Sequence, residues 1–92
     1  MNKLTDFRNN RELKRIDFEM KMYRLDGDIN SILDDLENCE DKETIKKHIE
    51  RISLLLEQYN ELKLCGIETI VIDLEFLNYV NGKLFDKYCE ML

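Results

Sequence analysis

The sequence predicts an all-α fold, in which a helical hairpin with a long first helix is followed by a C-terminal helix and a short fourth helix. The chain of 92 residues contains no proline and only three glycines, so few positions would interrupt a helix. Its apolar residues recur at alternating steps of three and four, the period of a helix packed on another helix. We expect one domain over 1–92, with helices at about 5–39, 42–64, 68–80 and 83–92.

The first predicted helix carries two rows of apolar side chains. One row consists of Leu13, Ile16, Met20 and Tyr23, and the other consists of Phe18, Met22, Leu25, Ile29, Ile32, Leu36 and Cys39. The two rows lie on different sides of the helix. We therefore expect one half of the helix to pack on the central helix and its other half to meet a further surface, such as a second copy. Gly27 is expected to stay helical, although glycine costs about 1 kcal/mol there relative to alanine.

Part of this helix has the spacing of a calcium-binding loop. Asp26, Asp28, Asn30, Asp34 and Glu37 stand at positions 1, 3, 5, 9 and 12 of an EF-hand pattern. Position 6 of that pattern requires glycine for a sharp turn, and this chain has serine there. We therefore expect a solvated acidic face on a continuous helix, and calcium binding is not expected.

The central helix, over 42–64, is the clearest element. Asp41 is a favourable N-cap, and Gly66 is suited to end the helix in the left-handed conformation. We expect a packing partner on each side, because the apolar positions exceed what one neighbour covers: Ile45, Ile49, Ile52, Leu54, Leu55, Leu56, Tyr59 and Leu62. His48, the only histidine, has no second ligand at a metal-binding spacing and is expected to flank the helix.

The C-terminal third fits two structures. Residues 70–76 alternate between apolar and polar in part, and Asn81-Gly82 is a strong hairpin turn signal, so a β-hairpin at 69–86 is the alternative. The helical step is also kept, at Ile67, Ile70, Leu74 and Leu77 and again from Phe85 to Leu92. We favour a helix over 68–80, a turn at Asn81-Gly82 and a fourth helix over 83–92, since a lone hairpin would leave open sheet edges.

Charge and composition narrow the function classes. The net charge is −6, but residues 1–24 hold seven basic and four acidic groups whereas residues 25–92 hold seven and sixteen. An acidic body with a basic arm suits protein contact better than nucleic-acid binding.

No apolar run approaches the roughly 20 residues of a membrane span, and the N-terminus does not resemble a signal peptide. The three cysteines are expected to be buried and reduced, which indicates a reducing, cytosolic setting.

These features favour a non-enzymatic protein-interaction module. The sequence shows no nucleophile–base pair, phosphate loop, metal set or cofactor motif. We expect a homodimer that also binds a protein partner through Met20, Met22 and Tyr23, which lie beside the basic arm. The acidic residues Asp34, Asp35 and Glu37, near the first turn, are further candidates for partner contact. One alternative is an acidic inhibitor that masks the nucleic-acid groove of a host defence enzyme. A further alternative is nucleic-acid binding through the basic N-terminal arm, formed by Arg8, Arg11, Lys14 and Arg15.

The C-terminal stretch suggests a biological setting. Residues 79–92, Tyr-Val-Asn-Gly-Lys-Leu-Phe-Asp-Lys-Tyr-Cys-Glu-Met-Leu, resemble the segment before the recognition helix in small phage late-gene transcription regulators. The C-terminal part of those regulators is similar to region four of sigma factors. Here Phe85 replaces the usual Trp, Asn78 stands where Arg is common, and the recognition helix itself does not follow Leu92. The resemblance implies a regulator of a phage or mobile element, in the cytoplasm of a bacterial host cell. It does not imply direct reading of DNA bases.

Overall fold

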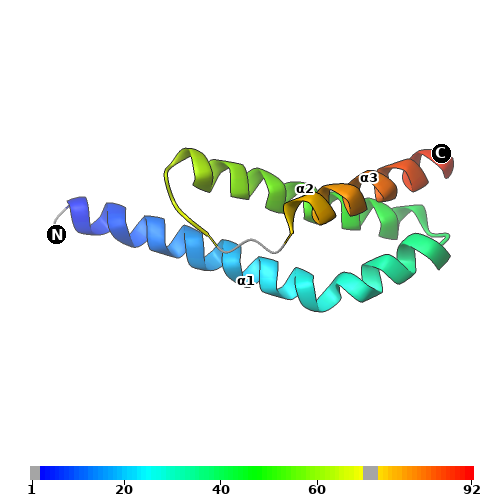
Figure 1. Cartoon of the computed structure of the whole chain (residues 1–92), viewed down its shortest axis with the longest axis horizontal. Helices are drawn as coiled ribbons and strands as arrows, with labels where there is room; N and C mark the ends of the chain where they lie inside the picture. Colours follow the sequence, from blue (N-terminus) through cyan, green and yellow to red (C-terminus); the bar gives the residue numbers. More distant parts are fainter. Residues whose placement is uncertain (1–2, 70–72) are drawn as a thin grey trace.

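The computed structural model of the chain describes residues 3–69 and 73–92, with side chains of the first helix described from residue 10 onward. Within these residues the chain forms three helices and no strand: α1 (Lys3–Asn38), α2 (Lys42–Leu64) and α3 (Leu74–Glu90). The prediction of an all-α fold is confirmed. The molecule is elongated, with extents of 52 × 23 × 20 Å, and α2 packs on both α1 and α3 (Figure 1). The expected partner on each side of α2 is therefore present.

Both ends of α2 are set by local sequence, as predicted. The Asp41 carboxylate accepts hydrogen bonds from the Glu43 backbone N–H at 3.2 Å and from the Thr44 hydroxyl at 2.8 Å. At the other end Gly66 has a φ of +73°, in the left-handed region that favours glycine. Its N–H donates to the Lys63 carbonyl at 3.0 Å, and the Ile67 N–H donates to the Leu62 carbonyl at 2.9 Å. This is a Schellman ending, and it turns Ile67 back onto the core.

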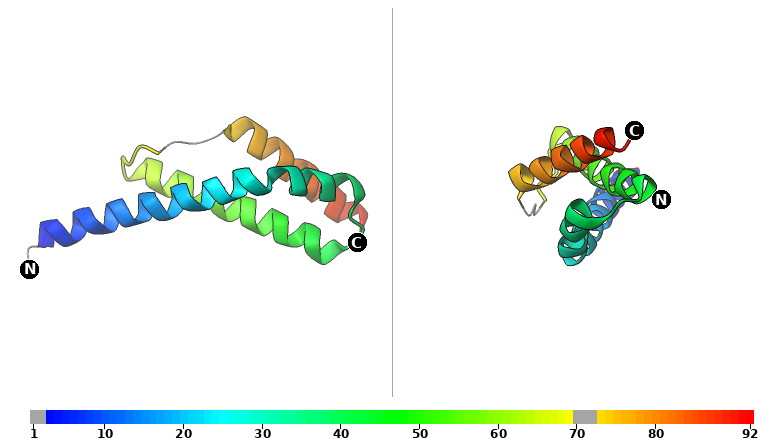
Figure 2. Two further views of the ribbon diagram at one scale, coloured as in Figure 1. Left: turned by 90° about the horizontal axis from the view of Figure 1, so that it is seen from below. Right: turned by 90° about the vertical axis from the view of Figure 1, so that its right-hand side faces the viewer.

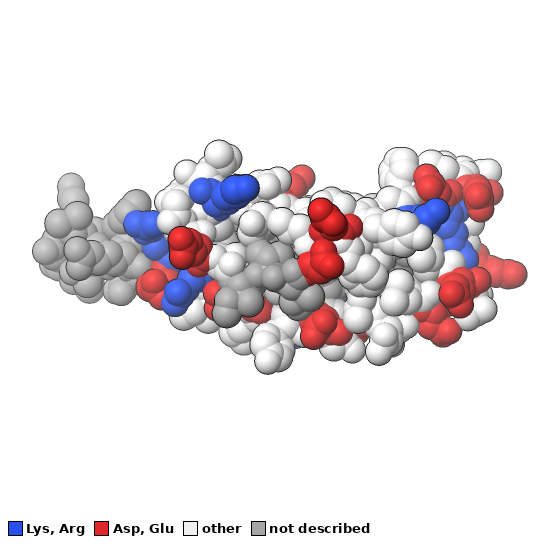
Figure 3. All heavy atoms as spheres, viewed as in Figure 1, with Lys and Arg blue, Asp and Glu red and all other residues white. Residues whose placement is uncertain are grey.

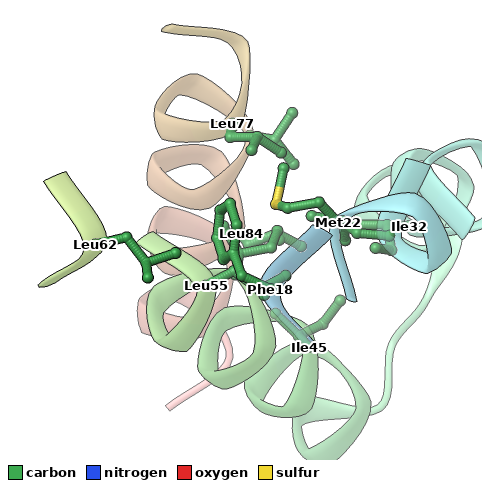
Figure 4. Packing of buried hydrophobic residues seen from close by; sticks show 11 residues of the cluster. Phe18, Met22, Ile32, Ile45, Leu55, Leu62, Leu77 and Leu84 are labelled. Atoms are coloured by element: carbon green, nitrogen blue, oxygen red, sulfur yellow. The ribbon is translucent and has the colours of Figure 1, made fainter. Parts of the chain in front are cut away.

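The core is formed by side chains from all three helices (Figure 4). The α1 helix contributes the row that begins at Phe18, whose ring lies 6.2 Å from that of Tyr59. No charged or polar residue is fully buried among the described residues, so the buried interior is apolar. The buried residues are Phe18, Met22, Leu25, Ile32, Ile45, Ile52, Leu55, Leu62, Leu77, Val80 and Leu84.

The prediction for the C-terminal third was wrong in its boundaries. The chain is not helical at 67–69, and α3 begins after Asp73, whose carboxylate accepts from the Phe76 N–H at 3.0 Å. The helix then runs through Asn81-Gly82 without a turn, so neither a separate fourth helix nor a β-hairpin over 74–86 forms; residues 70–72 lie outside the described part. The physical reason is the buried row Leu77, Val80 and Leu84, which crosses Asn81-Gly82 and stays on one face only if the helix continues.

The long α1 helix is continuous through Gly27, as predicted, and it bends in its second half (Figure 1). At about 1.5 Å per residue, its 36 residues span about 54 Å, compared with about 35 Å for the 23 residues of α2. Its N-terminal end therefore projects beyond α2 (Figure 2). At the opposite end, the Lys87 ammonium of α3 donates to the Leu36 carbonyl at 2.7 Å, where a cation satisfies the last turn of α1.

Candidate interaction surface

The apolar row Leu13, Ile16, Met20 and Tyr23 forms an exposed stripe on the outer face of α1, which we call the outer stripe. The exposed fractions of these four side chains are 62%, 44%, 52% and 82%. The steps between them are three, four and three residues, so the side chains lie along one side of the helix. The second apolar row of α1 is buried against α2 and α3, and the outer stripe faces away from it. The two rows predicted on this helix are thus one core row and one row left uncovered.

The structure corrects one predicted contact residue. Met22 is only 3% exposed, and Figure 4 shows its side chain directed toward Leu77 of α3. It belongs to the core row and is not available to a partner. Met20 and Tyr23 lie on the outer stripe and fit the prediction of an exposed contact surface. The prediction grouped Met22 with them because Met and aromatic side chains adapt well to partners. Each step along a helix changes the direction of the side chain by about 100°, so Met22 points away from the face of Met20 and Tyr23.

The predicted acidic contact residues lie on two different sides of α1. Beyond Tyr23 the outer face continues with Gly27, Asn30, Asp34 and Glu37, all exposed and at the same three–four step. Asp34 also accepts a hydrogen bond from the Asn38 side-chain amide at 3.0 Å. Asp35 instead faces α2, where its carboxylate lies 2.8 Å from His48 Nε2. Asp34 and Glu37 therefore share the outer face with Met20 and Tyr23, and Asp35 connects α1 to α2.

A second ion pair supports the same α1–α2 seam. The Arg51 guanidinium of α2 donates to the Asp28 carboxylate of α1 at 2.9 Å. Asp28 belonged to the EF-hand-like spacing, and this whole segment is helical in the structure. On a helix, successive positions of that pattern point in different directions and do not converge on one ion. Among the described residues, no group of three acidic, histidine or cysteine side chains is arranged to hold a metal.

The basic N-terminal arm is partly engaged within the molecule. Arg11 donates to the Cys65 carbonyl at 3.3 Å, and Arg15 forms an ion pair with Glu12 at 2.6 Å. Arg11 and Lys14 line a groove of about 610 Å³ between α1 and the end of α2, which the carboxylates of Asp17 and Glu61 also line. The side chain of Arg8 lies outside the described part. On the face of the molecule shown in Figure 3, basic and acidic groups are interspersed, unlike the continuous basic track that phosphates require.

The prediction that all three cysteines are buried was wrong. Cys65 and Cys89 are exposed and Cys39 is half-buried, and none of the three forms a disulfide. Cys65 occupies the end of α2 just before Gly66, and Cys89 lies on the solvent side of α3 next to the core-contacting Tyr88. Apolar character alone did not distinguish a core position from a neighbouring exposed one.

Comparison of the chain with protein-family models, curated proteins and solved structures gives no match. The resemblance of residues 79–92 to late-gene regulators therefore stays a prediction. In the described part of the chain, no helix combines the length and apolarity that crossing a membrane requires. We therefore take the outer stripe of α1 as the candidate interaction surface.

Proposed function

We propose that this chain is a non-enzymatic protein-interaction module that binds a helix of another polypeptide through the outer face of α1. The observation that carries the proposal is the outer stripe, four large apolar side chains left exposed at the spacing of a helix–helix seam. Exposed large apolar side chains also occur on α2, at Leu54 and Leu64, and on α3, at Phe76, Tyr79 and Phe85, but neither of these helices carries four of them in one row. Single exposed apolar residues are ordinary on protein surfaces, whereas a contiguous row at heptad spacing is typical of an interface.

The expected strength of such binding follows from the size of the stripe. Burying a fully exposed Leu, Ile or Met side chain contributes about 1.5–3 kcal/mol. The four residues are on average about 60% exposed, so covering them contributes on the order of 4–7 kcal/mol. Association costs about 4–15 kcal/mol in lost translational and rotational freedom. The stripe therefore supports binding only if the partner buries an apolar face of its own and polar contacts form at the borders, which favours a reversible complex.

The regulatory setting is part of the same proposal. The resemblance of residues 79–92 to phage late-gene regulators supports a role in a phage or mobile element. The outer stripe supports an action on regulation through protein contacts. Self-association, which the sequence analysis expected, is not part of this proposal, because a second copy would have to occupy the outer stripe that the protein partner uses.

Photo-crosslinking tests the proposal. Tyr23 on the outer stripe and Tyr79 on α3 are both exposed, at 82% and 62%, and each is replaced singly by benzoylphenylalanine in the cells that naturally contain the chain. We expect a covalent polypeptide adduct from position 23, its loss in the added double variant Ile16→Ser/Met20→Ser, and little adduct from position 79. Equal yields from positions 23 and 79, or an adduct unaffected by the double variant, would contradict the proposed interface.

A further inference from the structure

The borders of the outer stripe differ from its centre in charge. If the stripe residues take positions a and d of a heptad, the residues just before Leu13 and Met20 occupy the g border. That border consists of Glu12, Glu19 and Asp26, all acidic. The e border, on the other side, contains Asp17 and Arg24 and extends to Ser31. Four carboxylates and one guanidinium thus stand next to the apolar residues, and two of the carboxylates, Glu12 and Asp17, have an ion-pair partner on α1.

These borders disfavour pairing of α1 with a second copy in the antiparallel direction. In that arrangement the g borders of the two helices face each other, so Glu12, Glu19 and Asp26 of one copy meet the same three residues of the other. Contacts between Asp17 and Arg24 on the e borders offset part of this repulsion. Asp17 already forms an ion pair with Lys21 at 2.9 Å within its own helix. Like charges placed along an interface select against a partner that carries the same pattern.

Charge contacts do not favour parallel pairing of two copies either. The g border of one helix then faces the e border of the other, one heptad later. Glu12 meets Asp17 of the second copy, Glu19 meets Arg24, and Asp26 meets a serine. One like-charge contact and one opposite-charge contact balance, and no net attraction is left to set the register.

The rest of the outer face extends the same acidic character. Gly27 follows Tyr23 in the stripe, and a side chain placed there would contact no atom within 4 Å, so a partner helix can approach the backbone closely. Beyond it the exposed Asp34 and Glu37 continue the face. A helix lying along α1 would meet apolar residues first and carboxylates at the far end, with carboxylates at each position of the g border from Glu12 to Asp26.

We propose that the outer face of α1 selects an amphipathic helix of a different protein, whose apolar face is bordered by Lys and Arg, and that its acidic g border rejects a second copy of this chain. This inference rests on the proposed function and names the chemistry of its partner. Charge complementarity at the e and g positions is the usual determinant of partner choice between helices.

The protein itself provides the first test. The variant Glu12→Lys/Glu19→Lys/Asp26→Lys reverses the g border, and helical content by circular dichroism verifies its fold. In sedimentation equilibrium we expect wild type alone and the variant alone to be monomers, and an equimolar mixture to form a heterodimer that dissociates as salt is added. A second variant, Glu19→Gln/Asp26→Asn, keeps the test valid if the triple variant does not fold. It should weaken the rejection of a second copy without reversing the charge preference of the g border. Dimerisation of the wild type alone through the outer stripe would overturn the inference.

Two labelled helical peptides test which charge the partner helix must carry beside its apolar face. They share apolar residues at a and d and differ only in carrying Lys or Glu at every e and g position. Fluorescence anisotropy with the full chain should show at least about ten-fold tighter binding of the Lys peptide, and the charge-reversed chain should prefer the Glu peptide. Equal binding of both peptides that Ile16→Ser/Met20→Ser abolishes would overturn this inference and leave the proposed function standing. Binding of neither peptide by the chain would overturn both.

Discussion

Replacing Gly82 by alanine tests the main difference between the predicted and observed C-terminal structure. Gly82 lies inside α3, is exposed, and a methyl group added there would contact nothing within 4 Å. In a helix interior, alanine is more favourable than glycine because it loses less backbone entropy on folding. In an Asn-Gly hairpin turn, by contrast, the glycine has a positive φ that alanine adopts only with strain. The two structures therefore predict opposite signs for the same substitution.

We expect Gly82→Ala to raise the free energy of unfolding by about 0.5–1 kcal/mol. For a domain of 92 residues, a change of 1 kcal/mol shifts the melting temperature by about 4–8 °C, so the expected rise is about 2–8 °C. Thermal unfolding followed by circular dichroism at 222 nm measures the shift. Urea unfolding checks that the slope with denaturant is unchanged, which shows that the substitution changes stability without changing the surface exposed on unfolding.

Gly66→Ala is the matched control for this measurement. Gly66 has a φ of +73° and open space around it, so alanine there is strained without any steric clash. We expect Gly66→Ala to lower stability by about 1–2 kcal/mol, the cost of the left-handed conformation for an L-residue. Loss of stability in Gly82→Ala of the same size as in Gly66→Ala would refute the continuous α3 helix.

Three further predictions concern the packing of the helices, and denaturant unfolding measures each of them. Met22→Ala should cost about 2–5 kcal/mol because its side chain is buried, whereas Met20→Ala, two residues away on the outer stripe, should stay within about 0.5 kcal/mol of wild type; equal effects would contradict the assignment of the two rows. Asp73→Ala removes the N-cap of α3 and should cost about 0.5–2 kcal/mol, while Asp73→Asn should retain most of the stability. Lys87→Met keeps the aliphatic length but removes the hydrogen bond to the Leu36 carbonyl, and should cost about 1–3 kcal/mol; an unchanged unfolding midpoint would show that this contact contributes nothing.

Stability measurements distinguish residues that stabilise the fold from residues that bind a partner, and the functional conclusion depends on this distinction. Residues that hold the fold together should change the unfolding free energy, and residues of the outer stripe should change binding alone. Ile16→Ser and Met20→Ser are therefore expected to leave the melting temperature nearly unchanged while removing the crosslink from position 23. Outer-stripe residues that were structural would show the reverse pattern.

The sequence by itself determined the features that depend on neighbouring residues. Asp41 and Gly66 set the ends of α2 because an N-cap and a left-handed glycine act within one turn of the chain. The continuous heptad across Gly27 predicted an unbroken α1, since the periodic burial outweighs the cost of one glycine. The all-α class followed from the same periodicity.

Only the tertiary structure decided which apolar row of α1 is covered. Both rows consist mainly of large apolar residues at the same three–four spacing, so spacing alone does not distinguish Met20 from Met22, although the core row is the longer one. The distinction arises because α2 and α3 cover one side of α1 and leave the other open. The same reason explains α3: a two-residue turn signal at Asn81-Gly82 was weaker than the burial of Leu77, Val80 and Leu84 against residues distant in sequence. Burial depends on contacts between segments that are far apart in the chain, and such contacts exist only once the helices have packed.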